Sequence, residues 1–375
     1  MRIAVNTRLL LKDKLEGIGR FTNELMFRIV AAHPECEFHF IFDRPFDPDF
    51  IRYDNIVPHV VGPPLRHALL GWIWFDWSVR RKLKKIKPDV FFSSDSMNLL
   101  SPVCKSVTVL HDLNFEHFPE YFDPILRYYY QKRSPIVARN ASAIVTVSTF
   151  SAADISSIYA VDSAKIHVVY NAVGKEFIPS SEEVKIKIRE KYTSGKEFFV
   201  FVGALYKRKN LLNQIKAFEL FKETSGSDMK LLIVGNLVSD ANELIDYVRK
   251  SSFKDDIIFF GRLPEKELPA VLSAAKALTY VSSFEGFGMP LVEAMSCGTP
   301  IITSTTSSMP EVGGEAALYA DPFNIEEISQ RMKEISTDDE LRARLAQNAT
   351  VQVKKFDWDK SAESLWNVLF AVAKQ

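Results

Sequence analysis

Residues 198–210, FFVFVGALYKRKN, form the stretch that decides the fold. An apolar run rich in Phe and Val ends at Gly203, three cations follow, and Asn210 precedes a helical pattern of apolar residues. A short apolar run that leads through a glycine into an amphipathic helix is typical of a buried strand in a βαβ unit. We therefore expect a parallel sheet, with Asn210 capping the helix that follows.

The same alternation of apolar runs and helical patterns extends over the whole chain. Two series of strands are predicted, at 3–5, 37–42, 90–92, 107–110, 143–147 and 167–169, and at 198–202, 230–234, 257–260, 277–281, 300–303 and 317–319. Helical patterns lie between them, including 19–32, 210–224, 265–274 and 290–297. The periodicity lapses in residues 171–183, which gather Gly, Pro and Ser, and again near 354–359. The sequence therefore predicts an α/β protein with two Rossmann-like, doubly wound domains, at 1–171 and 184–355, and a segment 356–375 whose helix returns to the first domain.

Composition narrows the classes of partner. Basic and acidic residues are equal in number, 47 of each, whereas a nucleic-acid-binding protein usually has a basic excess. The three cysteines are far apart and give no disulfide framework or metal spacing. No apolar stretch suits a signal peptide or a membrane span, so we expect a cytoplasmic protein that binds no nucleic acid.

A second informative stretch, residues 283–297, reads SFEGFGMPLVEAMSC and carries the carboxylates Glu285 and Glu293. Pro290 suits the first turn of a helix, because its missing N–H would have no partner there. The glycine-rich loop before it can direct backbone amides at an anion, and the helix dipole adds to that attraction. We expect a diphosphate at this loop and a ribose at Glu293. The alternative is a glycine turn with solvated carboxylates.

Three further features follow predicted strands, where the ligands of open α/β sheets bind. Cations there would neutralise a leaving phosphate, whereas the alternative is a run of solvated charges. A histidine directly after a buried strand faces the ligand crevice, although such a residue is more often structural. The features are the cations Lys207, Arg208 and Lys209, the imidazole of His111, and the glycines Gly17 and Gly19 in the loop before the first helix.

Together these motifs resemble the GT-B glycosyltransferases, specifically the retaining enzymes of family 4 (glycosyl transferases group 1), in a mannosyltransferase-like form. The resemblance covers nearly the whole chain and is densest from residue 198 to 321. It implies two domains facing a central cleft, and transfer of a hexose from a nucleotide-diphosphate sugar to a glycan or lipid-linked acceptor in cell-surface polysaccharide or glycolipid synthesis. GDP-mannose is the first candidate donor. A UDP-sugar donor and a non-catalytic nucleotide-sugar-binding subunit are the alternatives.

The resemblance also implies roles for the residues. Catalysis would depend on His111 and Glu285 at the donor sugar and on Arg208 and Lys209 at the diphosphate. The donor-binding residues would be Gly17, Gly19, Gly203, Arg262, Leu263, Gly286, Phe287, Gly288 and Glu293. No metal or other cofactor is implied, and the product would retain its anomeric configuration through a front-face reaction. The chain departs from the family pattern at Ala204, where many relatives have Arg, Ser or Thr, and at Lys207, where many have Pro.

Rival enzymes share parts of this pattern. The glycine fingerprint of an NAD-dependent oxidoreductase fails, because Thr22 occupies the place of its third glycine. A sugar-nucleotide epimerase remains open, since fold does not fix function. Two Asp-x-Asp strings, at 47–49 and 357–359, lack the context of metal-dependent transferases.

Residues 65–87, LRHALLGWIWFDWSVRRKLKKIK, combine aromatic and basic residues. Helical spacing places Trp72 on the buried face and places Trp74, Trp77 and the basic cluster elsewhere. Aromatic residues beside a basic face suit peripheral contact with an anionic membrane at its inner face, and a lipid-linked acceptor. The alternative is a core-packed helix with a solvated basic back.

Overall fold

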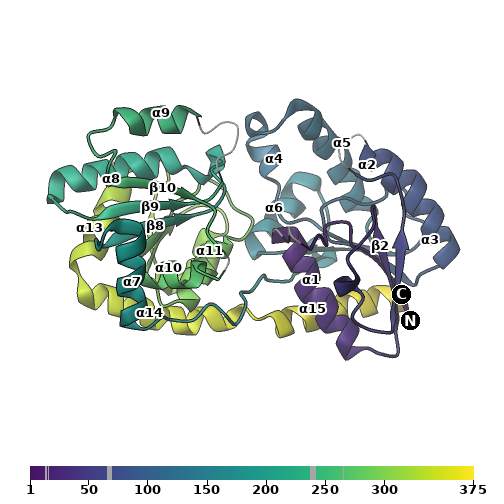
Figure 1. Ribbon diagram of the computed structural model, residues 1–375. Helices are drawn as coiled ribbons and strands as arrows, with labels where there is room; N and C mark the ends of the chain where they lie inside the picture. Colours follow the sequence, from purple (N-terminus) through teal and green to yellow (C-terminus); the bar gives the residue numbers. More distant parts are fainter. Residues whose placement is uncertain (13–14, 16, 66–69, 237–241, 265) are drawn as a thin grey trace. The chain divides into compact units, whose positions relative to one another are not determined.

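The computed structural model describes the chain except for residues 13–14, 16, 66–69, 237–241 and 265. It divides into two compact units, Met1–Asn171 with Trp358–Gln375, and Ala172–Asp357. Each unit is an open parallel sheet with helices packed on it (Figure 1). The predicted α/β class with two doubly wound domains is confirmed.

The first unit has a seven-stranded sheet in the order β3-β2-β1-β4-β5-β6-β7, all parallel. Its strands are β1 (Arg2–Asn6), β2 (Glu37–Phe42), β3 (Ile56–Val60), β4 (Val90–Ser93), β5 (Ser106–Val109), β6 (Ala143–Thr146) and β7 (Ile166–Val168). Its helices are α1 (Gly17–Ala32), α2 (Leu70–Ile73), a π-helical turn (Trp74–Val79), α3 (Arg80–Ile86), α4 (Asn114–His117), α5 (Pro124–Asn140), α6 (Thr149–Tyr159) and α15 (Trp358–Lys374). The strand order reverses between β1 and β4.

The core of this unit explains why its strands read as continuous apolar runs. The central strands are buried on both faces, as is typical of parallel sheets under helices. One cluster joins the sheet to the helical segment 70–86 and to α5; it contains Ala4, Ile41, Phe91, Trp74, Phe75, Val79, Leu83, Ile86 and Tyr129.

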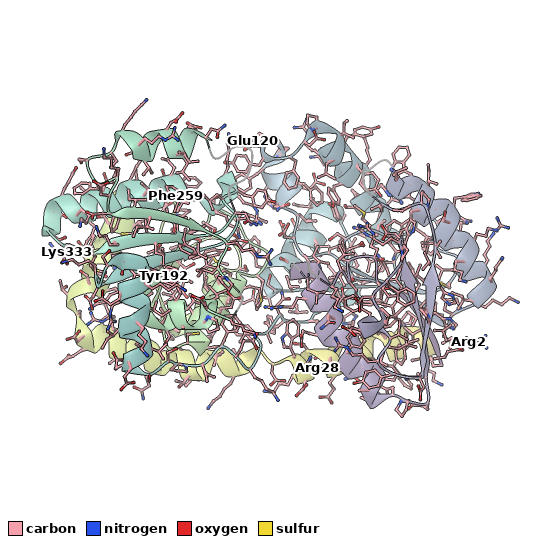
Figure 2. All side chains as sticks on the ribbon, viewed as in Figure 1. Arg2, Arg28, Glu120, Tyr192, Phe259 and Lys333 are labelled. Carbon is pink, nitrogen blue, oxygen red and sulfur yellow. The ribbon has the colours of Figure 1, made fainter. Side chains whose placement is uncertain are left out.

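The last helix, α15, completes the first unit by packing against α1. Arg28 of α1, labelled in Figure 2, donates from Nε to a carboxylate oxygen of Asp359 at 2.7 Å. The rings of His33 and Trp366 stack with their centres 3.5 Å apart, and the Ser361 hydroxyl donates to the carbonyl of Tyr170 at 2.8 Å. Residues from the two ends of the chain therefore share one core.

The second unit has a six-stranded parallel sheet in the order β10-β9-β8-β11-β12-β13, which reverses between β8 and β11. Its strands are β8 (Phe198–Val202), β9 (Lys230–Val234), β10 (Ile257–Gly261), β11 (Ala277–Tyr280), β12 (Ile301–Ser304) and β13 (Ala317–Ala320). Its helices are α7 (Glu182–Thr193), α8 (Leu211–Ser225), α9 (Asn242–Lys250), α10 (Leu268–Ala274), α11 (Met289–Ser296), α12 (Met309–Gly313), α13 (Ile325–Thr337) and α14 (Asp339–Gln352). Helix α8 packs beside α13, and α7 beside α10.

All twelve predicted strands are present, and sequence reasoning missed one more, β3. Its sequence, IVPHV, contains Pro58 and ends in the exposed Val60, so it lacks the apolar run of a central strand. The strand lies at the edge of the sheet, where proline is tolerated. The predicted start of the helix 265–274 lies outside the described residues.

The predictions for the tryptophans of residues 72–74 and for Asn210 were wrong. Trp74 is fully buried, and its indole donates to the carbonyl of Val61 at 2.5 Å, whereas Trp72 is 45% exposed. The π-helical turn inserts an extra residue per turn, which shifts the residues before it relative to the buried face. Asn210 does precede α8, but its side chain makes no cap; it donates to the carbonyls of Val281 at 3.0 Å and Pro322 at 2.6 Å.

Candidate active site

The switch point of the second sheet lies between β8 and β11. Ligands of open α/β sheets bind outside the carboxyl ends of the strands at such a point. The residues that follow these strands, 203–210 and 281–288, are therefore the candidate site. The two stretches are bonded to each other, because both the backbone N–H and the hydroxyl of Ser283 donate to the carbonyl of Arg208, each at 2.9 Å.

Three side chains converge there on the carboxylate of Glu285. Arg208 Nη1 donates to Oε2 at 2.7 Å, and Lys209 Nζ donates to Oε1 at 2.5 Å. Tyr280, the last residue of β11, donates its phenol proton to Oε1 at 3.1 Å, and its oxygen accepts a hydrogen bond from Lys209 Nζ. We call Arg208, Lys209, Tyr280 and Glu285 the Glu285 cluster.

Burial and charge fix the protonation state of this cluster. Burial favours the neutral form of Glu285, but the attraction of Arg208 and Lys209 outweighs burial and lowers the pKa of the carboxyl to about 2. Burial, and then the charge of Glu285, raise the pKa of Tyr280 well above its usual value. At neutral pH the cluster therefore holds two cations, one carboxylate and a neutral phenol, which leaves one positive charge in excess.

The loop that contains Glu285 is held by hydroxyl groups that follow β12. Ser308 Oγ lies 2.9 Å from the carbonyl of Glu285 and 3.0 Å from that of Phe287. The backbone N–H of Glu285 donates to Ser307 Oγ at 3.1 Å, and Thr306 Oγ1 donates to the carbonyl of Ser283 at 3.1 Å. These bonds fix the loop that the sequence predicts to hold the donor, and sequence reasoning did not find them.

Glycines shape the same edge of the sheet. Gly288, just before α11, has a φ of 96°, and a Cβ there would lie 2.4 Å from Met309 Cε. Gly203 and Gly235 directly follow β8 and β9, and a Cβ on Gly235 would lie 1.8 Å from the carbonyl oxygen of Gly203. Only glycine lets the two strand ends approach so closely. Gly235 was missed, although its position after a predicted strand repeats that of Gly203.

The remaining predicted residues of the second unit lie on neighbouring elements. Glu293 is buried on α11. Burial of the Cys297 thiol raises its pKa to about 12, and the charge of Glu293 adds to this shift. Arg262 and Leu263 follow β10; Leu263 is buried and Arg262 is exposed. The two carboxylates that the sequence paired, Glu285 and Glu293, are therefore both buried in the second unit.

His111 lies in the first unit, two residues beyond Val109, the last residue of β5. Its Nε2 is 2.8 Å from the carbonyl of Ser94, and its ring meets that of Phe21 edge-on with centres 5.2 Å apart. Because a carbonyl can only accept, Nε2 carries the proton, and Nδ1 of the neutral ring is an acceptor. Burial lowers the pKa of His111, so the ring is neutral at pH 7.

Gly17 and Gly19 occupy the first turn of α1, so the predicted helix 19–32 is present but the loop predicted for the two glycines is not. A Cβ on Gly19 would lie 2.6 Å from the carbonyl oxygen of Leu9, so glycine lets the helix begin close to the segment after β1. From the next turn, Thr22 Oγ1 donates to Ser94 Oγ at 2.6 Å. The start of α1 and His111 therefore meet at the same residue, Ser94.

The first sheet has its own set of polar side chains at the switch point between β1 and β4, and this set was not predicted. Arg8, after β1, forms an ion pair with the buried Asp95, after β4. Asn6 Nδ2 donates to Ser93 Oγ at 3.0 Å beside it. In both units, buried polar side chains thus lie where the strand order reverses.

The structure brings Arg208 and Lys209 into direct contact with Glu285, and Ser94 contacts both His111 and Thr22 of α1. The two Asp-x-Asp strings have other partners. Asp47 and Asp49 both pair with Lys12, at 3.0 and 2.9 Å, and Asp359 pairs with Arg28. In the described part of the chain, no group of three or more His, Cys, Asp or Glu residues is placed to hold a metal ion.

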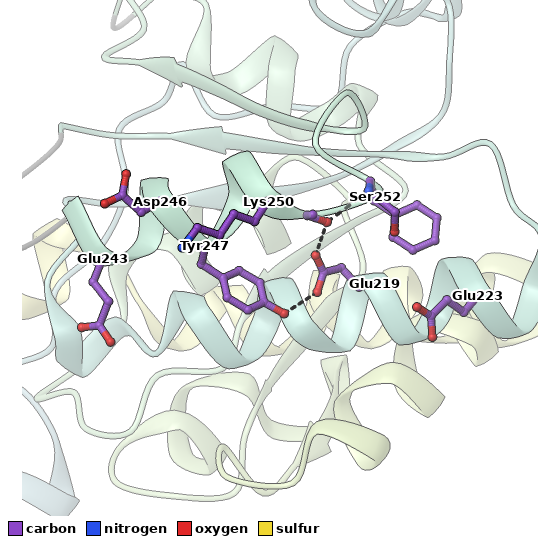
Figure 3. Close-up of a pocket in the computed structure, with 9 residues that line it drawn as sticks. Glu219, Glu223, Glu243, Asp246, Tyr247, Lys250 and Ser252 are labelled. Carbon is purple, nitrogen blue, oxygen red and sulfur yellow. Dashed lines mark hydrogen bonds between the residues drawn. The ribbon is translucent and has the colours of Figure 1, made fainter.

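A separate pocket lies between α8 and α9 of the second unit (Figure 3). Glu219 of α8 accepts hydrogen bonds there from the Tyr247 phenol at 2.6 Å and from the hydroxyl of Ser251. Its lining consists of Glu219, Glu223, Glu243, Asp246, Tyr247, Lys250, Ser251, Ser252 and Phe253. None of the predicted site residues is among them.

Comparison with known families agrees with this architecture. Residues 15–177 match the model of Glycosyltransferase Family 4, and residues 184–352 match that of Glycosyl transferases group 1. The chain therefore belongs to the GT-B glycosyltransferases of this family and is an enzyme that transfers a sugar.

Individual proteins are similar to this chain over most of its length. The chain is 26% identical to the O-antigen chain mannosyltransferase B of Escherichia coli over 93% of this chain and 94% of that one. It is 27% identical to the O-antigen chain mannosyltransferase RfbU of Salmonella typhimurium over 85% of this chain and 84% of that one. Among solved structures, the sucrose-phosphate synthase of Thermosynechococcus elongatus has the same fold, with a TM-score of 0.78 at 17% identity and 99% coverage of both chains. Among the helices of the described residues, none has both the length and the apolar character needed to cross a membrane.

Proposed function

We propose that this enzyme transfers mannose from GDP-mannose to a glycan or lipid-linked acceptor during synthesis of a cell-surface polysaccharide in the cytoplasm. The two relatives named as O-antigen mannosyltransferases support the sugar and the kind of product. The structural observation that carries the proposal is the Glu285 cluster. Two cations and a carboxylate at a switch point suit a diphosphate joined to a sugar.

In this proposal the cations act on the leaving group. The bond between the anomeric carbon and the phosphate oxygen breaks, and negative charge grows on the nucleoside diphosphate. Arg208 and Lys209 stabilise that charge, and the N-terminus of α11 adds its dipole. Because these groups are cationic and preorganised, no metal or other cofactor is required.

The other site residues hold the donor. Glu285 accepts hydrogen bonds from sugar hydroxyls, beside the backbone of Gly286, Phe287 and Gly288, and Glu293 accepts them from the ribose. Arg262 and Leu263 border the base. His111, whose Nδ1 is an acceptor, binds a hydroxyl of the donor sugar, and the residues at Gly17 and Gly19 approach the phosphates or the acceptor.

We propose a front-face reaction with retention. The acceptor oxygen bonds to the anomeric carbon on the face from which the diphosphate leaves, and the hydroxyl proton passes to the departing phosphate oxygen. This route needs no carboxylate nucleophile. A product of inverted configuration, detected by NMR of the glycosidic linkage, would contradict it.

The donor experiment is calorimetric titration with GDP, UDP, ADP, dTDP and NAD, on the wild type and on Glu293→Ala, followed by a transfer assay. GDP is expected to bind best. Loss of one or two charged hydrogen bonds, about 1.5–3 kcal/mol each, weakens its binding at least tenfold in the variant. Preference for UDP would favour the alternative UDP-sugar donor. Binding without any transfer to any acceptor would favour the non-catalytic subunit, and binding of NAD alone would overturn the site.

We also propose that the first unit contacts an anionic membrane surface through residues 65–87, of which 66–69 lie outside the described residues. Trp72, Ile73 and Trp77 are 45%, 49% and 64% exposed on α2 and the π-helical turn. Four exposed cations follow on and just after α3: Arg81, Lys84, Lys85 and Lys87. Exposed aromatic residues beside cations are typical of proteins that bind anionic lipid interfaces.

Co-sedimentation with vesicles tests this contact. The wild type is expected to sediment with vesicles that contain phosphatidylglycerol and not with pure phosphatidylcholine. Trp72→Ala with Trp77→Ala is expected to abolish sedimentation, whereas Phe323→Ala, a 68% exposed aromatic residue of the second unit, leaves it unchanged. Binding that ignores lipid charge would end this proposal and leave the sugar-transfer proposal intact.

A further inference from the structure

We infer that Gln214 of α8 is a positioning residue, which fixes the backbone of Lys209 relative to that of Val281 and so places the cations of the site opposite Glu285. The inference rests on the proposed function, in which Arg208 and Lys209 act on the donor diphosphate. The sequence motifs do not mark Gln214, because a single polar residue in an amphipathic helix reads as a solvent-facing one.

The side-chain amide of Gln214 bonds to both stretches of the candidate site. Gln214 is fully buried, its Nε2 donates to the carbonyl of Lys209 at 2.8 Å, and its Oε1 accepts from the backbone N–H of Val281 at 3.2 Å. A carbonyl only accepts and a backbone N–H only donates, so these partners fix the orientation of the amide. An apolar side chain of the same size could fill the space but could make neither bond.

These bonds lie at the switch point, where the ladder between β8 and β11 is short. The backbone pairs of the two strands are Ala277 with Phe199 and Leu278 with Val200. Val281, which follows β11, is bonded to side chains of the segment after β8. Its N–H donates to Gln214, and its carbonyl accepts from Asn210 Nδ2 at 3.0 Å. Side-chain amides therefore join the two strand ends across the switch point.

Helix α8 is fixed on the sheet, so its side chains can set the position of the loops. The rings of Phe218 and Phe221 on α8 contact that of Phe199 on β8, with centres 6.4 and 5.6 Å apart. The bonds from Ser283 to Arg208, and from Asn210 to Val281, do not involve Gln214. We therefore expect variants at 214 to fold and to lose only the exact placement of the two stretches.

Two substitutions of similar size test the inference. Gln214→Met removes both hydrogen bonds at every pH. Gln214→Glu restores both while its carboxyl is neutral, because a neutral carboxyl, like an amide, donates at one end and accepts at the other. Once ionised it only accepts, and it repels the carbonyl of Lys209. Burial favours the neutral form, so this carboxyl is expected to titrate well above its usual range.

The measurement is calorimetric titration with GDP, or with the nucleoside diphosphate that the wild type binds best, from about pH 6 to about pH 9. Dividing each affinity by that of the wild type at the same pH removes the titration of groups that all the proteins share. Gln214→Met is expected to bind about tenfold more weakly throughout, the value for one misplaced charged hydrogen bond. Gln214→Glu is expected to bind within about threefold of the wild type at low pH and to weaken at least to the level of Gln214→Met as its carboxyl ionises.

Gln352 provides a matched control, because it is a buried glutamine of the same unit. Its Nε2 donates to the carbonyls of Glu311 and Val312, at 2.9 and 3.0 Å. Gln352→Met is expected to lower the melting temperature as Gln214→Met does, and to leave the affinity for GDP unchanged. The pair of variants thus separates a loss of stability from a loss of positioning.

The inference fails if Gln214→Met binds GDP as the wild type does, or if Gln214→Glu binds no better than Gln214→Met even at pH 6. Equal weakening of GDP binding by Gln352→Met would also overturn it, since any loss of a buried amide would then have the same effect. A wild type that binds no nucleoside diphosphate would instead overturn the proposed function, before any variant at 214 is compared.

Discussion

The hydroxyl of Ser308 lies 2.9 Å from the backbone carbonyl of Glu285, so a side chain that follows β12 holds the loop that follows β11. The same oxygen is 3.0 Å from the carbonyl of Phe287. The position of the carboxylate that pairs with Arg208 and Lys209 therefore depends on a buried serine far from the motif.

Ser308→Ala is expected to lower the free energy of unfolding by about 1–3 kcal/mol, because buried carbonyls lose their donor. Donor affinity is expected to fall as well, since the loop loses its fixed conformation. Urea denaturation and nucleotide titration measure the two effects. Ser336→Ala, which removes an exposed hydroxyl that donates to the carbonyl of Lys333 at 2.8 Å, serves as the control and is expected to be neutral.

Glu285→Gln is expected to separate binding from transfer. The substitution removes one negative charge beside Arg208 and Lys209, so a nucleoside diphosphate binds at least as tightly as in the wild type. Transfer is expected to slow on the order of a hundredfold, because the charged partner of the donor sugar is lost. Titration and initial-rate assays measure both, with the exposed Glu315→Gln as the control. Loss of diphosphate binding would show that the carboxylate itself, and not the cations, holds the ligand.

Gly235→Ala is expected to abolish nucleotide binding and to give misfolded protein. The new Cβ would lie 1.8 Å from the carbonyl oxygen of Gly203, and a backbone atom between two strands cannot move aside. Gly226→Ala also places a side chain on backbone of positive φ, 64° against 155° at Gly235, but no atom lies within 4 Å of the new Cβ. It is expected to cost about 1 kcal/mol in a thermal melt. Similar effects of the two substitutions would mean that backbone strain, and not close approach, requires glycine at 235.

Stability is expected to fall between pH 6.5 and about 4 because of a histidine pair on β2 and β3. His39 Nδ1 and His59 Nε2 are 2.9 Å apart. Burial lowers the pKa of both rings. At His59, burial and the positive charge of Lys82 lower the pKa from 6.5 to about 4. At His39, Glu37 opposes the lowering of the pKa and Arg2 adds to it. In this window the unfolded chain binds protons that the folded protein does not, so acid favours unfolding.

Thermal melts from pH 7.5 to 4.5 measure this slope, and His59→Gln is expected to reduce it. Glu285 gives a separate and lower window, because its pKa is depressed to about 2 from 4.5. Its contribution is complete above pH 4.5 and is lost as the pH falls toward 2. An unchanged slope in His59→Gln would show that other groups control acid stability above pH 4.5.

The sequence predicted the sheets because buried parallel strands are continuous apolar runs, which need no knowledge of their neighbours. It missed β3 because an edge strand tolerates Pro58 and exposed residues. It exchanged Trp72 and Trp74 because an ideal helical period cannot foresee a π-helical turn. In each case the missing information is tertiary, since the edge position and the irregular turn depend on what packs alongside.

The candidate site divides in the same way. Arg208, Lys209 and Glu285 were predicted from residue type and from their places after strands, and the structure brings them into contact. Tyr280 and Ser308 were not predicted, because each acts on a residue distant in sequence; Tyr280 and Lys209 are 71 positions apart. The role of a phenol or a hydroxyl depends on the atom that it contacts in the fold, and a residue pattern does not show that contact.

The position of α15 bears on how the chain is synthesised. This helix packs in the first unit, yet its residues come after the whole of the second unit. During translation the ribosome must therefore synthesise residues 172–357 before it makes the helix that packs on α1. The second unit can fold as a contiguous segment, whereas the first waits with one side of α1 uncovered. The unit whose synthesis begins first is therefore the unit that is completed last.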